Sequence, residues 1–349
     1  IADASERKAA IQQQIDAAAA SIGGVVAQNE DLLEEVTNLV EQPAAIVCAF
    51  PKEYLDIPAP VQTGVMRKKQ PYFTVLAHPP PASSHREGSQ LLPNFITVRN
   101  GPAADIDEVR KGNEDVVNAR FADAAYFYRE DIKKPLDAYL PRLDTITFQG
   151  KLGSMLDKTK RIESLVEPIA SQLGLESSDL EIAKKAAHLC KADLATNMVV
   201  EITALQGTMG REYHLRTSND ADKAAVADAI FEHYLPRYAG DRTPATPAGL
   251  TVALADKLDS IAGLFAVGLG PKGNADPFAL RRAAIGIVQD LIASDKRFSL
   301  HAGLKSAMAR LPVPMSSDAM NAAHTFIVDR ARQALLDEGY RYDVVDAVL

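Results

Sequence analysis

The chain has 349 residues, a formal net charge of −8, 47% apolar residues and 24% charged residues. This length suffices for two domains with a core each, and the composition excludes a wholly disordered chain. The acidic balance gives no bulk electrostatic sign of a nucleic-acid partner, and the two cysteines, Cys48 and Cys190, form neither a disulfide framework nor a zinc motif. The cysteine pattern fits a reducing compartment. We expect no signal peptide, because the chain opens with a charged amphipathic helix. We expect no membrane-spanning helix, because no apolar run reaches about 18 residues.

The first hundred residues predict a small mixed α/β unit. Helical periodicity predicts helices over 5–22, 31–40 and 58–69. Runs rich in β-branched and aromatic residues predict strands over 44–50, 72–77 and 94–99. The Pro- and Ser-rich stretch 78–90 separates the last two strands and is predicted to be an exposed loop.

From about residue 105 the pattern becomes helical. Helices are predicted over 106–121, 122–140, 153–173, 179–206, 220–235, 247–267, 278–293, 300–309, 318–338 and 342–349. Short connections with Gly and Pro separate them, which is typical of an all-α domain. The predicted fold is therefore mainly α, with a small α/β domain over 1–103, a helical connector over 104–150 and a helical domain over 151–349.

One stretch of the helical region, from His188 to Tyr213, combines apolar periodicity with charge. It reads as part of a long buried helix that ends near Gly207. Lys191, Asp193 and Glu201 lie within it, and charges are costly to bury unless they are paired. The stretch is thus either a central structural helix or the floor of a site.

Asp256 lies inside another apolar helix and allows two interpretations. With His188 and Asp193 it makes a set of side chains that suits a divalent metal. Alternatively, Asp256 pairs with a lysine such as Lys191, so that each buried charge is compensated. Because charged residues in protein interiors are usually paired, the sequence favours the ion pair.

The glycine-rich segment 268–282 resembles a phosphate-binding loop only in part. It lacks the spacing of a P-loop, and no strong strand precedes it. It is better read as a connection in which Asp276 caps the next helix and Pro277 takes its first position. Arg281 and Arg282 follow one turn inside that helix, either to hold phosphate or carboxylate or as part of a solvated, ion-paired face.

Two basic clusters are candidates for contacts with a phosphate backbone. One comprises Lys151, Lys158, Lys160 and Arg161. The other comprises Arg67, Lys68 and Lys69, followed by the aromatic residues Tyr72 and Phe73. Such clusters are either nucleic-acid contacts or solvated surface. No catalytic triad is indicated, because GxSxG is absent and Cys190 lies on an apolar helix.

Eight strings of the sequence together resemble one protein family. They are LLEEVTNLVEQP, LLPNFITVRNG, VRKGNEDVVNARFADAAYFYREDIKKPL, LPRLDTITFQGKLGSMLDKTKRI, CKADLATNMVVEITALQGTMGREY, HYLPRYAGDRTP, ALADKLDSIAGLFAVG and PKGNADPFALRRAAIGI. In this order they span residues 32–287. The chain resembles the β subunit of the bacterial-type glycyl-tRNA synthetase, or the β portion of a fused chain, and so many long matches in register make this resemblance specific.

The resemblance implies a division of labour between two subunits. In that family the α subunit holds the class II catalytic core, which activates glycine with ATP and Mg²⁺, and the β subunit recognises tRNA and is required for aminoacylation. For this chain the resemblance implies tRNA(Gly) and the α subunit as partners, no cofactor of its own and no membrane. The implied location is the bacterial cytoplasm, or an organelle of bacterial descent.

The resemblance also implies a helical HD-like domain, a fold related to metal-dependent phosphohydrolases. Active HD enzymes hold metal with an early His, an adjacent His-Asp pair and a late Asp. In this sequence the early His falls near Arg161, the pair falls on Cys190 and Lys191 (or, shifted by one residue, on Lys191 and Ala192), and the late Asp is Asp256. An Arg and a Lys would repel Mg²⁺ or Mn²⁺. We therefore expect a degenerate, metal-free site with the Lys191 ammonium in salt-bridge reach of Asp256.

The predicted function is that of a tRNA-binding accessory core that does not aminoacylate alone and has no catalytic residue. Family members normally extend beyond both ends of this sequence, and its first residue is not Met, so it reads as an excised core. The residues expected to face tRNA are all basic: Lys151, Lys158, Lys160, Arg161, Arg211, Arg237, Arg281, Arg282, Arg67, Lys68 and Lys69. The alternatives are an HD-type metal-dependent phosphohydrolase and an inter-subunit scaffold without tRNA contact.

Overall fold

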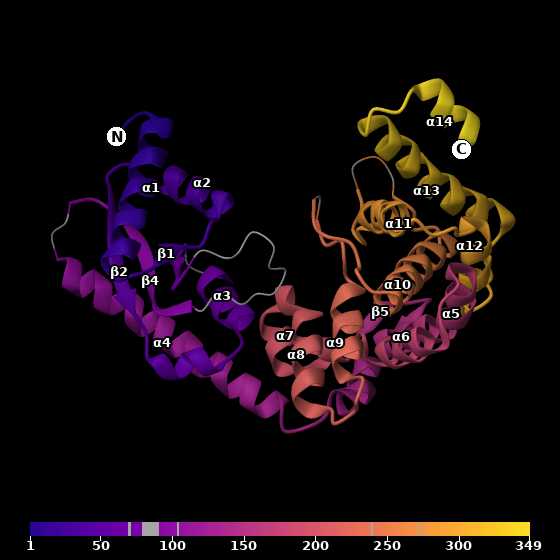
Figure 1. Ribbon diagram of the computed structural model, residues 1–349, viewed down its shortest axis with the longest axis horizontal. Coiled ribbons are helices and arrows are strands. Elements are labelled where there is room, and N and C mark those ends of the chain that lie inside the picture. Colours follow the sequence, from indigo (N-terminus) through magenta and orange to yellow (C-terminus); the bar gives the residue numbers. More distant parts are fainter. Residues whose placement is uncertain (69–70, 79–90, 103–104, 239, 272, 274) are drawn as a thin grey trace. The chain divides into compact units, whose positions relative to one another are not determined.

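The computed structural model describes residues 1–68, 71–78, 91–102, 105–238, 240–271, 273 and 275–349 (Figure 1). It contains two compact units. Unit 1 is Ile1–Lys133 with Asn197–Leu205, and unit 2 is Lys134–Thr196 with Gln206–Leu349. The prediction of a mainly helical chain with a small N-terminal α/β part is confirmed. The long helix α4 (Ile106–Asp131) belongs to unit 1, whereas the sequence pattern assigns it to a connector.

Unit 1 contains a four-stranded antiparallel sheet with strand order β1-β3-β4-β2. Its strands are β1 (Val25–Val26), β2 (Pro43–Ala49), β3 (Phe73–Leu76) and β4 (Leu91–Asn100). Besides α4, its helices are α1 (Ala4–Ser21), α2 (Glu30–Leu39), the 3-10 helix η1 (Lys52–Asp56), α3 (Ala59–Lys68), α7 (Asn197–Glu201) and the 3-10 helix η4 (Thr203–Leu205). The three predicted strands are β2, β3 and β4, while the two-residue β1 is too short to carry a periodic signal.

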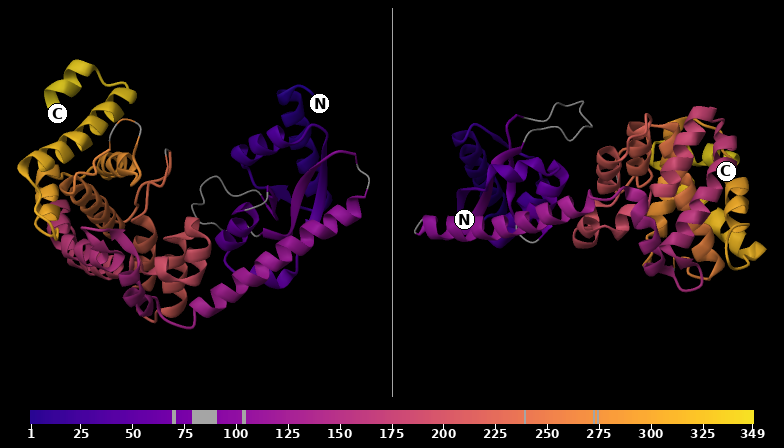
Figure 2. Two further views of the ribbon diagram at one scale, coloured as in Figure 1. Left: turned by 180° about the vertical axis from the view of Figure 1, so that it is seen from behind. Right: turned by 90° about the horizontal axis from the view of Figure 1, so that it is seen from below.

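Helices α1 and α2 cover one face of this sheet. The core between them consists of apolar side chains, namely Ile11, Ile15, Ala19, Leu32, Leu33, Val36, Val40, Phe73, Val75 and Ile96. Because strand residues alternate between faces, the buried residues Ile46, Cys48 and Phe95 lie on the other face. Helix α4 runs beside the sheet (Figures 1 and 2), and its Phe121 ring lies 4.7 Å from the ring of Phe50.

Strand β2 is an edge strand whose outer edge is covered by side chains. Gln14 of α1 and Arg110 and Glu114 of α4 bond to its backbone, and we call these three residues the edge side chains. The backbone groups that they bond are Pro43 O (3.1 Å), Ala45 N (3.0 Å), Val47 O (3.0 Å) and Ala49 N (2.8 Å). The edge side chains therefore take the place of a neighbouring strand.

Unit 2 is built almost wholly from helices. They are the 3-10 helix η2 (Leu136–Thr145), α5 (Met155–Leu173), α6 (Ser177–Leu189), the 3-10 helix η3 (Ala192–Ala195), α8 (Thr208–Thr217), α9 (Lys223–Glu232), α10 (Pro247–Ala266), α11 (Leu280–Ser294), α12 (Leu300–Met308), α13 (Ser317–Asp337) and α14 (Tyr342–Val348). A small antiparallel ribbon of β5 (Thr147–Gln149) and β6 (Gly153–Ser154) precedes α5. This ribbon was not predicted.

Helix α10 is the central helix of unit 2. Most of its residues are buried, and it contacts α5, α6, α9, α11, α12 and α13. Thr246 caps its N-terminus by accepting a hydrogen bond from Gly249 N, and Pro247 takes the first position. Helix α5 begins with a capping box of Ser154 and Asp157. These caps fix where both helices begin and hence which side chains face each other.

The prediction of one long helix over 179–206 is wrong. The chain instead forms α6, η3, α7 and η4 in turn, and α8 follows. Helix α6 ends at Leu189, Thr196 has an extended backbone, and Gly207 has a φ of +77°, so the predicted helix is broken at several points. Asp193 bridges the segment between Thr196 and Gly207, because its Oδ2 accepts hydrogen bonds from Gly207 N (2.6 Å) and Gly210 N (3.1 Å). The apolar residues of this segment belong to unit 1, which local periodicity cannot reveal.

The two helices predicted over 106–121 and 122–140 are also wrong in their boundaries. Helix α4 continues from the first range into the second without a break and ends at Asp131, and the 3-10 helix η2 (Leu136–Thr145) follows. Over the described ranges of the chain, no helix is both long and apolar enough to cross a membrane.

Candidate functional site

Four helical segments of unit 2 bring six ionisable side chains together in its interior. We call them the buried ion cluster, which comprises Lys158 and Arg161 of α5, Lys191 after α6, His233 after α9, and Asp256 and Asp259 of α10. On α5 and on α10 the two members are three positions apart, so both side chains lie on the same side of their helix. Three cations thus face two carboxylates.

Asp256 lies between two lysines. Its Oδ1 is 2.8 Å from Lys158 Nζ, and its Oδ2 is 2.7 Å from Lys191 Nζ. The side chains are 14% exposed for Asp256 and 4% exposed for each lysine. Burial alone would raise the pKa of the Asp256 carboxyl, but the two ammonium groups outweigh burial and lower this pKa far below its usual range. The predicted contact between Lys191 and Asp256 is confirmed, and Lys158 is an additional partner.

Asp259 joins the other cations of the cluster. Its carboxylate is fully buried and accepts hydrogen bonds from Arg161 Nε (2.6 Å), Arg161 Nη2 (3.2 Å) and Lys158 Nζ (3.0 Å). Arg161 Nη1 also donates to the carbonyl of Leu152 at 2.9 Å. The two-point contact between guanidinium and carboxylate fixes the orientation of both groups. Lys158 therefore links the two carboxylates of α10.

His233 completes the cluster as a neutral imidazole. Its Nδ1 lies 2.5 Å from the carbonyl oxygen of Ile230, which accepts only, so Nδ1 carries the proton. Its Nε2 then accepts a hydrogen bond from Lys191 Nζ at 2.9 Å. Burial and, after it, the positive charge of Lys191 lower the pKa of His233 well below its usual value. The imidazole thus orients Lys191 without adding charge.

The buried ion cluster does not suit a divalent metal. Of the positions expected for an HD-type site, only Asp256 carries an oxygen ligand, and both its carboxylate oxygens face ammonium groups. Burial raises the pKa of the Cys190 thiol to about 12, so that this residue offers no thiolate. Across the residues that the structure describes, no group of three or more His, Cys, Asp or Glu side chains is placed to hold a metal ion.

The structure does not bring together the three residues of the metal set considered from the sequence. His188 pairs with Glu163 at 2.9 Å. Asp193 accepts hydrogen bonds from backbone N–H groups, including that of Gly207. Asp256 is engaged by lysines. Each of the three residues has partners of its own, which corrects the metal interpretation in favour of the ion pair.

The first predicted basic cluster is divided between the surface and the interior. Lys151, on the turn between β5 and β6, and Lys160, on α5, are exposed. Lys158 and Arg161 are buried in the ion cluster, because the side of α5 that carries them packs against α10. Their charged groups are therefore not available to a phosphate backbone, and we correct their assignment as tRNA-facing residues.

Arg211 and Arg237 are partly exposed and have carboxylate partners. Arg211 Nε is 2.8 Å from Asp228 Oδ1, and Arg237 Nε is 2.9 Å from Asp241 Oδ2. These ion pairs hold the guanidinium groups in place at the surface. They also reduce the local positive charge, so these residues contribute less to a basic surface than their number suggests.

The N-terminus of α11 presents the remaining predicted arginines. The prediction that Asp276 caps this helix with Pro277 in the first position is wrong, because α11 begins at Leu280 and its N-cap is Ala279. Asp276 nevertheless accepts hydrogen bonds from Leu280 N and Arg281 N, each at 2.9 Å. Arg281 also donates to the carbonyl of Gly273. Arg282 is exposed in the first turn. Lys272, in the preceding glycine-rich segment, lies outside the described residues.

The second predicted basic cluster lies at the end of α3. Arg67 is exposed, whereas the side chain of Lys68, all of Lys69 and residues 79–90 of the predicted loop lie outside the description. Tyr72 and Phe73 are buried, which corrects the prediction of an aromatic surface beside the basic run. Phe73 belongs to the core of unit 1, and Tyr72 is 3% exposed, so neither ring forms an open surface for stacking with a nucleic-acid base.

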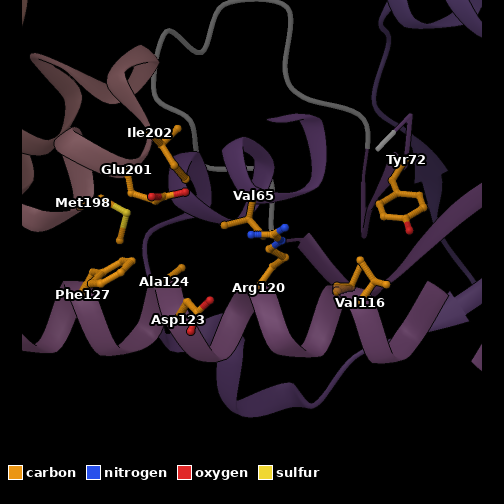
Figure 3. A pocket seen from close by; sticks show the side chains of 11 residues that line it. Val65, Tyr72, Val116, Arg120, Asp123, Ala124, Phe127, Met198, Glu201 and Ile202 are labelled. Atoms are coloured by element: carbon orange, nitrogen blue, oxygen red, sulfur yellow. The ribbon is translucent and has the colours of Figure 1, made fainter. Parts of the chain in front are cut away.

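Unit 1 has a surface cavity of about 190 Å³ between α3, α4 and α7 (Figure 3). Apolar and aromatic side chains form its walls, namely Val65, Tyr72, Val116, Val117, Ala124, Phe127, Met198 and Ile202. Three charged residues lie among them, namely Arg120, Asp123 and Glu201. Figure 3 shows the α4 side chains and the α7 side chains converging on this space.

One carboxylate holds α7 beside this cavity. Asp131, at the end of α4, is fully buried. Its Oδ1 accepts hydrogen bonds from Asn197 N (3.0 Å) and Asn197 Nδ2 (2.9 Å), and its Oδ2 accepts one from Met198 N (2.9 Å). The carboxylate therefore occupies the N-terminus of α7, where unpaired N–H groups favour a negative charge.

Sequence reasoning missed the inward direction of Lys158 and the roles of Asp259 and His233. The signal for Lys158 is present, because counting back by four and seven from the buried Ile162 and Leu165 gives residue 158. Asp259 lies three residues after Asp256 on the same apolar helix, which offers a second carboxylate for a second cation. His233 offers no such signal, since its place follows from the packing of α9 against α6.

Comparisons with known proteins identify the family. The family model described as "Glycyl-tRNA synthetase beta subunit" matches residues 1–349. The "Glycine--tRNA ligase beta subunit" of Clostridioides difficile is 45% identical over 352 residues, covering 100% of this chain and 49% of the relative. The protein with the same description from Trichodesmium erythraeum is 44% identical over 351 residues, covering 99% of this chain and 48% of the relative. The chain spans about half the length of these curated relatives, and it belongs to the glycyl-tRNA synthetase beta subunit family.

Proposed function

We propose that this chain is the tRNA-binding accessory core of a glycyl-tRNA synthetase β subunit. In this proposal an α subunit uses ATP and Mg²⁺ to attach glycine to tRNA(Gly) in the cytoplasm, while this chain contacts the tRNA and binds no cofactor. The observation that carries the proposal is the pairing of Asp256 with Lys158 and Lys191. Where an HD phosphohydrolase needs a metal ligand this chain has an ion pair, which supports a binding role instead of hydrolysis.

The tRNA contacts of this proposal come from exposed cations of unit 2. Lys151 and Lys160 flank the start of α5, and Arg282 lies at the start of α11. Long flexible lysine side chains contact phosphates as point charges, without reading the base sequence. Because phosphate contacts release counterions, the affinity for tRNA should fall steeply as salt is added.

Replacing Lys151 and Lys160 together with alanine is expected to weaken binding to a tRNA(Gly) transcript and to flatten its salt dependence. Each phosphate contact contributes about 0.7–0.9 to the slope of log affinity against log salt, so loss of both contacts should reduce the slope by roughly 1.5. Filter binding at a series of salt concentrations measures both quantities.

Replacing the exposed Lys296 and Arg297 together with alanine provides the matched control, because it also removes two positive charges from unit 2, at residues outside the predicted tRNA-facing set. This control should keep the wild-type slope. An affinity of the wild-type chain that does not change with salt would contradict the proposal. So would hydrolysis of a phosphate ester by this chain with Mg²⁺ or Mn²⁺, which is the expectation for the alternative phosphohydrolase.

A second candidate function is that of an inter-subunit scaffold, and the cavity of unit 1 favours it. An apolar hollow bordered by Arg120, Asp123 and Glu201 suits a bulky apolar side chain with charged neighbours, as protein interfaces provide. We propose the α subunit as the protein that supplies this side chain. Its contact with unit 1 is compatible with tRNA contacts from unit 2, so both functions can belong to one chain.

Replacing Val116 with glutamate is expected to weaken binding to the α subunit at least about tenfold, because a charge would occupy the apolar hollow. Val116 is exposed and lies on α4, where glutamate is a good helix former, so the fold should be retained. Sedimentation velocity of the mixed subunits, with and without tRNA, measures the change. Val200→Glu is the control, since Val200 is exposed on α7 but does not line the cavity. Equal binding of both variants would exclude docking at this cavity.

A further inference from the structure

Unit 2 has a surface cavity of about 260 Å³ between η2, α6 and the end of α8. We call it the α6–α8 cavity. Pro135, Leu136 and Leu189 form its apolar wall, and its other lining residues are polar or charged. Neither the buried ion cluster nor the cations of the proposed tRNA contacts line this cavity. It is therefore a separate candidate site.

One buried side chain of this cavity lacks a hydrogen-bond partner. His214, in the last turn of α8, is 6% exposed and lines the cavity. Its Nε2 atom is buried and forms no hydrogen bond with the described residues. Burial lowers the pKa of His214, so the imidazole is neutral at pH 7 and one of its two nitrogens is an acceptor. Because buried polar atoms are nearly always paired, a ligand that brings hydrogen-bond donors would complete this site.

Two exposed carboxylates line the same cavity and have acceptor oxygens to spare. The side chain of Asp137, on η2, forms no hydrogen bond or ion pair with the described residues. The carboxylate of Asp220, after α8, lies 3.9 Å from Lys185 Nζ, which is beyond hydrogen-bond distance. Lys185 Nζ instead donates to Asp222 at 2.7 Å. The carboxylates of Asp137 and Asp220 can therefore accept hydrogen bonds from a ligand.

The charges of the α6–α8 cavity sum to a negative value. The carboxylates that line it or bond to its lining are those of Asp137, Glu163, Asp220 and Asp222. The corresponding positive groups are Lys185, Lys223 and, when it is protonated, His188. Four negative charges thus face two or three positive charges. A cationic ligand is favoured over an anion such as phosphate, because opposite charges attract.

The arrangement of the acceptors favours a guanidinium over an ammonium group. A guanidinium is planar, carries five N–H donors and is weakly hydrated, whereas an ammonium is a compact and strongly hydrated point charge. The acceptors come from three places in the chain, namely Asp137 on η2, His214 on α8 and Asp220 after α8. A planar group with several donors can serve such separate acceptors at once. The apolar wall suits the hydrocarbon stem of an arginine side chain.

We propose that the α6–α8 cavity binds the guanidinium group of an arginine side chain that a partner protein carries. Charge complementarity supports this occupant, and arginine is among the residues enriched at the centres of protein interfaces. Asp137, Lys185, His188 and Asp220 are exposed, so a side chain of another protein reaches the cavity from solvent. The inference goes beyond the proposed function, because the cavity has no part in the proposed tRNA contacts.

The test uses the whole chain, isotope-labelled in its seven histidines. The ring signals of His214, identified by their loss in His214→Gln, are followed by NMR during titration with N-acetyl-L-arginine methylamide, a blocked arginine residue. They should shift along a single binding curve. N-acetyl-L-citrulline methylamide has nearly the same shape without the charge and should bind at least about tenfold more weakly. The corresponding lysine compound should bind at least about threefold more weakly, because an ammonium is more strongly hydrated.

Substitutions at the rim of the cavity have a matched control. Asp137→Asn and Asp220→Asn should each weaken binding of the blocked arginine about two- to fivefold, which is the range for exposed ion pairs. Asp318→Asn removes the same charge from an exposed position of unit 2 that does not line the cavity, and it should bind within about 1.5-fold of wild type, because salt screens distant charges. Equal weakening by all three variants would overturn the inference, because net charge alone would then explain binding.

Three further outcomes would overturn the inference. The first is that the blocked arginine leaves the His214 signals unchanged. The second is that inorganic phosphate shifts these signals at lower concentration than the blocked arginine does, which would identify an anion site. The third is that agmatine, a free guanidinium compound, binds at least about tenfold more tightly than the blocked residue, since the occupant would then be a small molecule. None of these outcomes concerns tRNA affinity, so the inference and the proposed function can fail independently.

Discussion

Replacing Asp256 with alanine is expected to lower the free energy of unfolding of this chain by about 3–5 kcal/mol. The substitution removes the carboxylate that lies 2.8 Å from Lys158 Nζ and 2.7 Å from Lys191 Nζ. Lys158 keeps Asp259 at 3.0 Å, whereas Lys191 loses the carboxylate that it contacts. A buried charge without its partner is among the most destabilising changes in a protein interior. Urea unfolding followed by circular dichroism measures the effect.

Two controls make this expectation specific. Glu167→Ala removes one of the two carboxylate partners of the exposed Lys184, and should leave the urea midpoint nearly unchanged. The double variant Lys191→Met/Asp256→Ala should be more stable than Asp256→Ala alone, because it removes the cation that loses its carboxylate. A loss below about 1 kcal/mol for Asp256→Ala would show that the cluster is hydrated and would contradict the expected burial penalty.

The Asp256 carboxyl also makes the free energy of unfolding depend on pH. Its folded pKa lies below the usual value of about 3.9, so the stabilisation from its charge is present at neutral pH and is lost as pH falls through the lowered pKa. The difference in stability between wild type and Asp256→Ala should therefore stay constant from about pH 8 to pH 5 and shrink in strong acid.

Replacing Asp131 with alanine should have the second largest effect, a loss of roughly 2–4 kcal/mol. The change leaves Asn197 N and Met198 N, at the start of α7, without their hydrogen-bond acceptor. A buried unpaired donor such as Met198 N costs about 1–3 kcal/mol, and the part-buried Asn197 N costs about 1 kcal/mol, the lower end of that range. The loss should be local, so amide hydrogen exchange within 197–205 should accelerate more than exchange elsewhere in unit 1.

Asp131→Asn is the matched control for this prediction. The amide keeps one acceptor oxygen and nearly the same volume, so it should retain part of the protection of 197–205. If the alanine variant accelerated exchange in α1 and α2 as strongly as in α7, the carboxylate would act on the whole of unit 1, and the local role would be excluded.

The ion pair of Lys191 and Asp256 could be predicted from the sequence because two independent constraints agree. Both residues lie in apolar stretches of the sequence, where charge demands a partner, and both fall on positions that the resemblance to HD enzymes assigns to a metal site. Lys158 shows the limit of the same reasoning. Lys158 lies in the sequence near Lys151, Lys160 and Arg161, and a run of basic residues does not show which side chain points inward. Only the positions of the apolar residues of α5 show that Lys158 lies on its buried side.

The breaks in the predicted helix over 179–206 could not be found from local signals. Met198, Ile202 and Leu205 continue the apolar periodicity of the preceding residues, so the pattern favours one helix. Helix α6 instead ends at Leu189, and the carboxylate of Asp131, distant in the sequence, binds the N-terminus of a new helix at Asn197. Helical periodicity measures which residues are apolar, and does not identify the unit in which they are buried.

The cover on strand β2 has a consequence for the order of events during synthesis. Gln14 is made before the strand, but Arg110 and Glu114 follow the backbone groups that they bond by 63 and 65 residues. The edge of β2 at Val47 and Ala49 therefore stays open on the growing chain until α4 has left the ribosome and folded back. During that interval the N–H and C=O groups of this strand can pair with another chain. The folding of α4 onto β2 is thus a late step in synthesis, and it protects the edge of the nascent sheet from pairing with other chains.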